Sequence, residues 1–221
     1  MKYVATWLYQ IHKHHKSYKM TSEEMTLEEA IIFAADLEKS GKAKSIEWYD
    51  HADTYWTTKQ LRKLKTVTDT EPTDIQAYFD AGFDQTSKQS GLGISIYYKQ
   101  HHKNYRLRIN QLLELLEDNN EAEYAAMYFL LDHLERLNIR HQTIHVYADS
   151  YVVIKQLGDE WPVYEEHYQK WHERIEKKAS QLGITVHYHH IPREKNKEAD
   201  KLASKALNNV QVEALSELTQ D

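Results

Sequence analysis

The order of strand-like and helix-like segments after residue 74 restricts the fold of this chain more than any other feature of its sequence. Apolar alternation predicts three consecutive strands, at 75–80, 92–99 and 104–109. The segments predicted after them are helix 119–137, strand 143–148, helix 150–157, helix 162–182, strand 184–191 and helix 196–207. Three successive strands favour an antiparallel meander, and the later alternation favours parallel additions. The sequence therefore predicts an α/β fold, a mixed sheet with helices on its faces.

The polar stretch VTDTEPTD, at 67–74, separates this region from a shorter periodic one. Because it contains a proline and lacks periodicity, we expect a linker there. Residues 1–66 predict a small α+β module of order ββαββα, whose first helix begins with a capping box of Thr26 and Glu29. The polar residues 208–221 are expected to form a tail outside the fold.

Composition limits the ways in which this chain can bind a partner. The formal net charge is −6, and residues 1–72 hold equal numbers of basic and acidic side chains, so the excess acid lies in the second region. Such a chain is poorly suited to bind nucleic acid through bulk charge without local basic patches or metal ions. The absence of cysteine excludes disulfide-linked partners and thiolate metal sites. No apolar run reaches the length of a membrane span, and we expect a cytoplasmic monomer.

The N-terminal module combines aromatic and basic side chains. The aromatic residues are Tyr3, Trp7, Trp48 and Trp56, and the basic ones lie in the predicted helix KQLRKLK. Such groups can grip the bases and backbone of a nucleic acid. Alternatively, the aromatic rings pack a small core, and the sequence favours that second interpretation.

Four carboxylates stand at positions where a fold of this kind would bring them together. Asp80 and Asp149 each end a predicted strand, and such sites form at the carboxyl ends of parallel strands. Glu123 lies on the apolar face of its helix, and Asp200 borders the apolar face of the last helix. Each acid also has a structural alternative, as a turn residue, a salt-bridge partner or an N-cap.

Convergence of four carboxylates requires compensation by positive charge. Without it the acids repel one another strongly in a site of low dielectric constant. Oxygen-only ligands suit Mg²⁺ or Mn²⁺ better than zinc. A pair of such ions is a common device for phosphodiester hydrolysis. By contrast, Asp118 and Glu121 fit a helix start, and we expect Glu121 to face solvent.

Four motifs, in this order, resemble the type 1 ribonuclease H family: YFDAGFD, NNEAEYAA, YADS and PREKNKEADKLA. The resemblance covers roughly residues 74–207, and for the domain at 75–207 it implies a five-stranded mixed sheet of order 3-2-1-4-5. It implies an endonuclease that cuts the RNA strand of an RNA–DNA hybrid and leaves 5′-phosphate and 3′-hydroxyl ends. The implied ligands of two Mg²⁺ ions, which Mn²⁺ can replace, are the acids already singled out: Asp80, Glu123, Asp149 and Asp200.

The same resemblance implies substrate contacts. Asn119 and Asn120 match an asparagine pair that reads 2′-hydroxyl groups, the feature that marks a strand as RNA. Gly82, after Ala81, would allow close approach of the sugar–phosphate backbone. The alternative for the asparagines is that they only shape the start of their helix.

Two departures from the family pattern leave a second function open. Asp118 stands where members often have a threonine that binds a phosphate of the DNA strand, and the loop 192–196 lacks the histidine of many members. These differences favour a non-catalytic or weakly active nucleic-acid-binding module, whereas the complete set of acids favours an enzyme. A related nuclease acting on other substrates is a third possibility. The histidine-rich segments IHKHHK, QHHK and HYHH are expected to be solvated.

Overall fold

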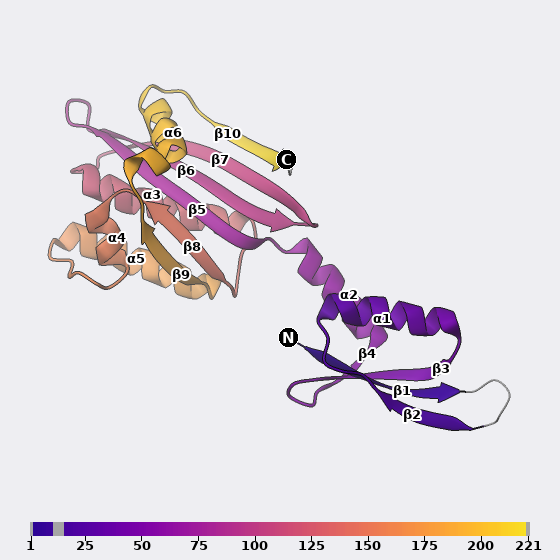
Figure 1. Cartoon of the computed structure of the whole chain (residues 1–221). Helices are drawn as coiled ribbons and strands as arrows, with labels where there is room; N and C mark the ends of the chain where they lie inside the picture. Colours follow the sequence, from indigo (N-terminus) through magenta and orange to yellow (C-terminus); the bar gives the residue numbers. More distant parts are fainter. Residues whose placement is uncertain (1, 11–15, 220–221) are drawn as a thin grey trace. The chain divides into compact units, whose positions relative to one another are not determined.

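The computed structural model of the chain describes residues 2–10 and 16–219 and forms two compact units, Met1–Thr70 and Glu71–Asp221 (Figure 1). Each unit has its own hydrophobic core and is described by itself. Most of the histidine-rich segment at 11–16 lies outside the described residues. Among the helices that the structure describes, none has the length and apolar character needed to cross a membrane.

The N-terminal unit is a four-stranded antiparallel sheet of order β2-β1-β3-β4 with two helices. Its elements are β1 (Tyr3–Gln10), β2 (Ser17–Thr21), α1 (Leu27–Ser40), β3 (Ala43–Asp50), β4 (Tyr55–Thr57) and α2 (Thr58–Thr70). Helix α1 begins with the expected capping box, because the Thr26 side chain accepts from Glu29 N and the Glu29 carboxylate accepts from Thr26 N. It ends at Gly41, whose φ of 65° is accessible to glycine at little cost.

The four aromatic residues that could bind a nucleic acid are not all exposed on the surface of this unit. Tyr3 and Trp48 are fully buried in its core, and Trp7 and Trp56 are partly buried against the same cluster. The idea that these four rings grip a nucleic acid is therefore wrong for Tyr3 and Trp48. The small unit needs them to build a core of sufficient area.

The expected linker at 67–74 is mostly regular structure. Helix α2 continues to Thr70, and strand β5 (Thr73–Asp84) begins three residues later. Only Glu71 and Pro72 separate the two elements. The helix stops there because a proline disfavours helical backbone at the residue before it.

The C-terminal unit contains a six-stranded mixed sheet of order β10-β7-β6-β5-β8-β9. Strands β5, β6 (Gln89–Gln100) and β7 (Lys103–Glu114) form an antiparallel meander. Strands β8 (Thr143–Ala148) and β9 (Thr185–His190) add in parallel on the other side of β5. The order β7-β6-β5-β8-β9 confirms the expected 3-2-1-4-5 arrangement.

The sixth strand corrects the expected tail at 208–221. Strand β10 (Glu213–Leu218) pairs antiparallel with β7. The buried Asn110 of β7 fixes its start, because the side chain donates to Val210 O at 2.8 Å and accepts from Val212 N at 2.7 Å. The tail therefore pairs with a strand that would otherwise be an edge of the sheet.

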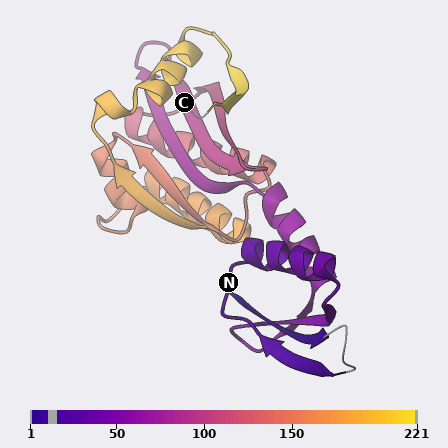
Figure 2. The same cartoon turned by 45° about the vertical axis from the view of Figure 1, so that its right-hand side comes forward.

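Helices cover the two faces of this sheet unequally (Figures 1 and 2). Helix α3 (Asn119–Arg136) packs on β5 and β6, and α5 (Glu166–Leu182) packs on α3. Helix α4 (Tyr151–Leu157) completes this layer, whereas α6 (Lys197–Leu207) lies alone on the opposite face, over β5, β6 and β7. The core lies between the sheet and the first layer, where Ala77, Phe79 and Ile94 are fully buried.

Candidate active site

Asp80 and Asp149 lie at the same edge of the sheet because their strands are parallel neighbours. The register pairs Tyr78 of β5 with Tyr147 of β8. Asp80 lies two residues after Tyr78, and Asp149 lies two residues after Tyr147. Because side chains alternate between the faces of a sheet, both carboxylates project from the same face as the two tyrosines. The prediction that these two strand ends meet is confirmed by this register.

Asp200 reaches the site because α6 packs unusually close to the sheet. Gly93 of β6 pairs with Asp80, and a Cβ atom at Gly93 would lie 2.2 Å from the carbonyl oxygen of Ala199. A Cβ atom at Gly91 would lie 2.1 Å from the carbonyl oxygen of Ala203. Two glycines on the strand and two alanines on the helix thus bring the start of α6 against β6.

Glu123 enters from the opposite layer, on α3. Its side chain is buried, and it accepts a hydrogen bond from the backbone N–H of Ala81, next to Asp80. Its Oε2 is buried and has no hydrogen-bond partner within residues 2–10 and 16–219. A buried carboxylate oxygen without a donor is costly, and it marks a place where a cation would be stabilised.

The electrostatics of the site show a shortage of positive charge. Burial, followed by the charge of Asp149, raises the pKa of Asp80 to about 8. Burial, followed by the charges of Asp80 and Asp149, raises the pKa of Glu123 well above its usual range. Asp80 and Asp149 are also hydrogen-bonded to each other. The carboxyl groups are therefore close enough to hinder one another's ionisation.

Two residues that the sequence did not single out hold the outer acids. Asn196, before α6, donates from Nδ2 to Asp149 Oδ1 at 2.6 Å and to Phe79 O at 2.9 Å. Arg193, in a short 3₁₀ turn (Arg193–Lys195), donates to Asp200 Oδ1 at 2.7 Å. Asn196 stands where an ordinary N-cap is expected, but α6 starts without a side-chain cap. The only signal in the sequence was its position immediately before the motif that carries Asp200.

The donor set fits a hard divalent cation, although it is not gathered as a finished metal site. Across residues 2–10 and 16–219, no three acidic or histidine side chains are grouped so that they could hold a metal ion. Arg193 holds one oxygen of Asp200, and Asn196 holds one oxygen of Asp149. The orphaned Oε2 of Glu123 and the oxygen-only chemistry of the four acids suit Mg²⁺ or Mn²⁺.

Apart from the four acids, a depression with a volume of about 410 Å³ lies at the start of α3. Asn119 and Asn120 line it together with Lys88. Asp118 also lines it and caps α3 by accepting from Glu121 N at 2.9 Å. Burial raises the pKa of Asp118, but hydrogen bonds from Glu121 N and the Tyr168 hydroxyl outweigh that effect, so the pKa lies below its usual range.

The structure also shows the surroundings of Gly82, expected to lie near the substrate backbone, and of the histidines at the end of β9. The missing Cβ of Gly82 would lie 2.9 Å from Leu207 Cδ1, so the strand approaches a side chain of α6 closely at this position. His189 is bonded to His145 at 2.9 Å, and His190 packs its ring against Tyr151. Within the described residues, His189 contacts His145 and Tyr147, and His190 contacts Tyr151, so neither histidine is placed against the four acids.

Comparison with known proteins agrees with this architecture. A family described as reverse transcriptase-like matches residues 78–206. The uncharacterized protein YpeP of Bacillus subtilis (strain 168) is 39% identical over 194 residues, which are 88% of this chain and 85% of YpeP.

Solved structures share the fold of the C-terminal unit. The N-terminal RNase H domain of Rv2228c from Mycobacterium tuberculosis is 25% identical with a TM-score of 0.53, covering 62% of this chain and 94% of that one. RNase H1 from Halobacterium salinarum NRC-1 is 22% identical with a TM-score of 0.52, over 61% of this chain and 98% of that one. LC11-RNase H1 in complex with an RNA/DNA hybrid is 22% identical with a TM-score of 0.53, over 62% of this chain and 98% of that one.

Proposed function

Because the chain belongs to the reverse-transcriptase-like family of RNase H domains, we propose that it hydrolyses the RNA strand of RNA–DNA hybrids with Mg²⁺. The observation that carries the proposal is that acids from four separate segments lie near enough to act on one another: burial, and then Asp149 and Asp200, raise the pKa of Asp80, and burial, and then Asp80 and Asp149, raise that of Glu123. Groups arranged at such a cost in stability are typical of functional sites. A solved relative of the same fold holds an RNA/DNA hybrid, which agrees with this substrate.

Asp80, Glu123, Asp149 and Asp200 would hold the metal ions in this proposal. When bound, Mg²⁺ supplies positive charge that offsets these carboxylates and the charge that develops on the phosphate. The chain itself orients the ligands. Asn196 fixes the Asp149 carboxylate, and the Ala81 N–H fixes one oxygen of Glu123.

Recognition of the RNA strand is assigned to the start of α3. Asn119 is exposed and Asn120 is half-buried, so their amides can reach a ligand in the depression that they line. An amide can donate to and accept from a 2′-hydroxyl group, which DNA lacks. Lys88 in the same depression provides a cation for a phosphate, beside the acid Asp118.

The test is a cleavage assay with end-labelled substrates. RNA–DNA hybrid, duplex DNA and duplex RNA are each incubated with Mg²⁺, Mn²⁺ or EDTA. We expect cleavage of the hybrid alone, in either metal but not in EDTA, with 5′-phosphate and 3′-hydroxyl products. If the hybrid stays intact at high protein concentration in Mg²⁺ and also in Mn²⁺, the proposal is contradicted.

A second candidate is a nucleic-acid-binding module that retains the fold without its chemistry. Asp118 in the substrate depression and the ion pair between Arg193 and Asp200 favour it. Binding measured in EDTA, followed by addition of Mg²⁺ to the same complex, separates the two functions. A pure binding module would hold the hybrid in EDTA and leave it intact when Mg²⁺ is added.

A further inference from the structure

A positively charged side chain, that of Arg193, holds one of the four acids of the candidate active site. Arg193 lies in the 3₁₀ turn between β9 and α6, and its Nη2 donates to Asp200 Oδ1 at 2.7 Å in an ion pair. Burial dominates the raised pKa of Asp80 and of Glu123, and the charge of Arg193 acts against that rise at both acids. The guanidinium therefore offsets part of the acidic charge of the site when no metal ion is bound there.

The side chain of Arg193 can move without a change in the turn that carries it. It is 77% exposed, and the side chain of Asp200 is 30% exposed. Separate hydrogen bonds hold the backbone of the turn, because Pro192 O accepts from Lys195 N at 2.8 Å and Arg193 O accepts from Asn196 N at 3.0 Å. An ion pair with such an exposed partner contributes little to stability, so this one can open at small cost.

The carboxylate of Asp200 cannot serve Arg193 and a divalent cation together at low cost. Its Oδ1 already accepts from the guanidinium. A second cation on that oxygen, or on Oδ2 of the same carboxylate, would lie beside the guanidinium, and two positive charges at such a short distance repel each other. The ion pair and metal binding at Asp200 are therefore alternatives.

Asn196 holds the other outer acid, Asp149, without this conflict. Its amide is neutral, so it does not repel a cation on the carboxylate that it orients. It is only 1% exposed, and its Nδ2 is fixed by two acceptors, Asp149 Oδ1 at 2.6 Å and Phe79 O at 2.9 Å. Of these two side chains, Arg193 is the one whose charge opposes metal binding and whose exposure lets it leave.

We propose that Arg193 is an internal counter-ion that occupies Asp200 until a divalent cation binds and that then releases this carboxylate. The inference rests on the proposed function, because it takes Asp200 as a ligand of the metal ion. The affinity of the chain for the metal ion is accordingly lower than that of the same acids without the guanidinium. Arg193 thus sets the metal concentration at which the site fills.

The test is calorimetric titration of Mn²⁺ into the full chain without nucleic acid, so that its readout does not depend on cleavage. Arg193→Gln removes the competing charge and should bind Mn²⁺ about fivefold more tightly than wild type, the upper range for an exposed ion pair. Arg193→Lys keeps the charge and should stay near wild type, because a single hydrogen bond does not require the planar guanidinium. In a chain that already carries Asp200→Asn, Arg193→Gln should bring much less gain, since the pair is then absent.

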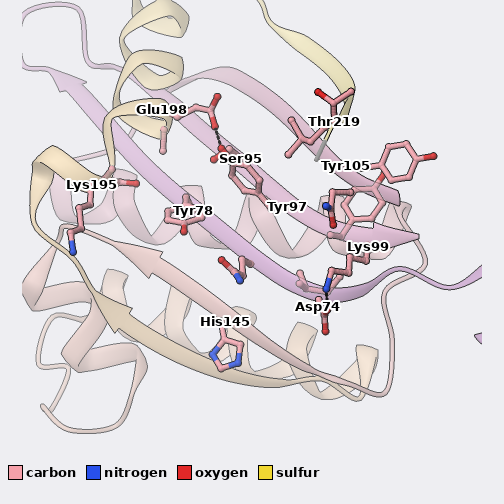
Figure 3. Close-up of a pocket in the computed structure, with 17 residues that line it drawn as sticks. Asp74, Tyr78, Ser95, Tyr97, Lys99, Tyr105, His145, Lys195, Glu198 and Thr219 are labelled. Atoms are coloured by element: carbon pink, nitrogen blue, oxygen red, sulfur yellow. Dashed lines mark hydrogen bonds and ion pairs between the residues drawn. The ribbon is translucent and has the colours of Figure 1, made fainter. Parts of the chain in front are cut away.

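Lys195→Gln is the matched control, because it removes one positive charge from the same turn. Lys195 is exposed and lies at the edge of a cavity between the sheet and α6, with its ammonium directed away from that cavity (Figure 3). Charges exposed in this way are screened by salt, so we expect Mn²⁺ affinity to stay within about twofold of wild type.

Thermal melting of the same proteins separates competition from a structural role. Arg193→Gln should melt at or below the wild-type temperature in EDTA, yet gain more from Mn²⁺. A lower melting temperature with unchanged Mn²⁺ affinity would mean that Arg193 only stabilises the turn, and the inference is overturned while the proposed function stands. Equal gains in Lys195→Gln and Arg193→Gln would overturn it as well, because net charge would then explain both. If neither wild type nor Arg193→Gln binds Mn²⁺, the inference and the proposed function fail together.

Discussion

Asp80 gives the clearest separation of stability from activity at the residue scale. Asp80→Asn replaces an acid whose ionisation is opposed by burial and by the neighbouring carboxylates, as its raised pKa shows, with a neutral amide of similar size. We expect hybrid cleavage to be lost while the melting temperature stays equal or rises. Calorimetric melting and a cleavage assay on the same preparation test this. A variant that cuts hybrid at near wild-type rate would contradict the role assigned to Asp80.

Glu121 and Glu123, two residues apart on α3, form a matched pair. Glu121 is buried, not solvent-facing as its helical phase suggested, since it accepts from Trp171 Nε1 at 2.9 Å and from Glu117 N at 2.7 Å. Glu121→Gln should lower the free energy of unfolding by about 1–3 kcal/mol, because an amide cannot accept at both positions. Glu123→Gln should abolish cleavage without such a loss.

Urea unfolding and activity per folded molecule check this pair. Equal loss of activity in both variants would mean that Glu121 also serves the chemistry. Loss of stability in Glu123→Gln alone would reverse the two assignments.

Whether the role of a single residue could be predicted from the sequence depends on how far along the chain its interaction partners lie. Asp80 and Asp149 were predictable because a strand end is a local feature, and Glu123 because helical periodicity is local as well. The partners of Glu121 and Asp149 were not, because Trp171 and Asn196 lie about 50 residues away along the chain. Only tertiary packing brings such donors to the acids.

At the scale of elements, the contact of α6 with β6 determines where Asp200 lies. A Cβ atom at Gly93 would meet the backbone oxygen of Ala199 at 2.2 Å, and a helix backbone cannot give way locally. Gly93→Ala should therefore shift α6, lower stability by about 1–3 kcal/mol or more, and reduce cleavage by the folded protein.

Gly82→Ala is the control for this contact. There the new methyl group would meet only the side chain of Leu207, with Cδ1 at 2.9 Å and Cγ at 3.9 Å, and the end of that side chain can rotate away. We expect small changes in melting temperature and in KM. A large rise in KM with normal stability would instead support direct contact between Gly82 and the substrate backbone.

The turn between β3 and β4 supplies a prediction about pH. A hydrogen bond from Trp56 Nε1, opposed by burial and helped by Thr54 N and Ala52 N, holds the pKa of Asp50 down to about 2. The pKa is lower in the folded state, so the stabilisation is complete above about pH 4 and is lost as pH falls towards 2. Asp50→Asn should speed amide exchange at Trp56 at pH 7, and the difference from wild type should vanish near pH 2.

Elements differ in how far the sequence predicts them. The strands and helices of 75–207 have strong periodicity, and the sheet order follows from it. Strand β10 was missed because its alternation, with Val212, Ala214 and Leu218 half-buried, is weak and surrounded by polar residues. Its formation depends on Asn110 and the free edge of β7, which the local sequence does not contain.

At the scale of the whole molecule, the two units make different contributions. The excess acid and all four candidate catalytic residues lie in the C-terminal unit, which has its own core. The N-terminal unit buries Tyr3 and Trp48, and it pairs Arg62 with Glu38 at 2.6 Å. The cationic side chains of α2 left for a polyanion are therefore few, chiefly the exposed Lys59 and Lys63.

A chain that starts at Glu71 should accordingly fold, keep kcat and show only a moderate rise in KM at low salt. Each lysine–phosphate contact changes the slope of log affinity against log salt by about 0.7–0.9, so loss of Lys59 and Lys63 should make it shallower by at most about 2. The full chain with Lys59→Gln and Lys63→Gln should reproduce the same slope, because the aromatic rings of the unit serve its core. If the shortened chain matches the full chain in KM at every salt concentration, residues 1–70 do not bind the substrate. If it loses far more affinity than the double variant, the unit contacts nucleic acid through groups other than these two lysines.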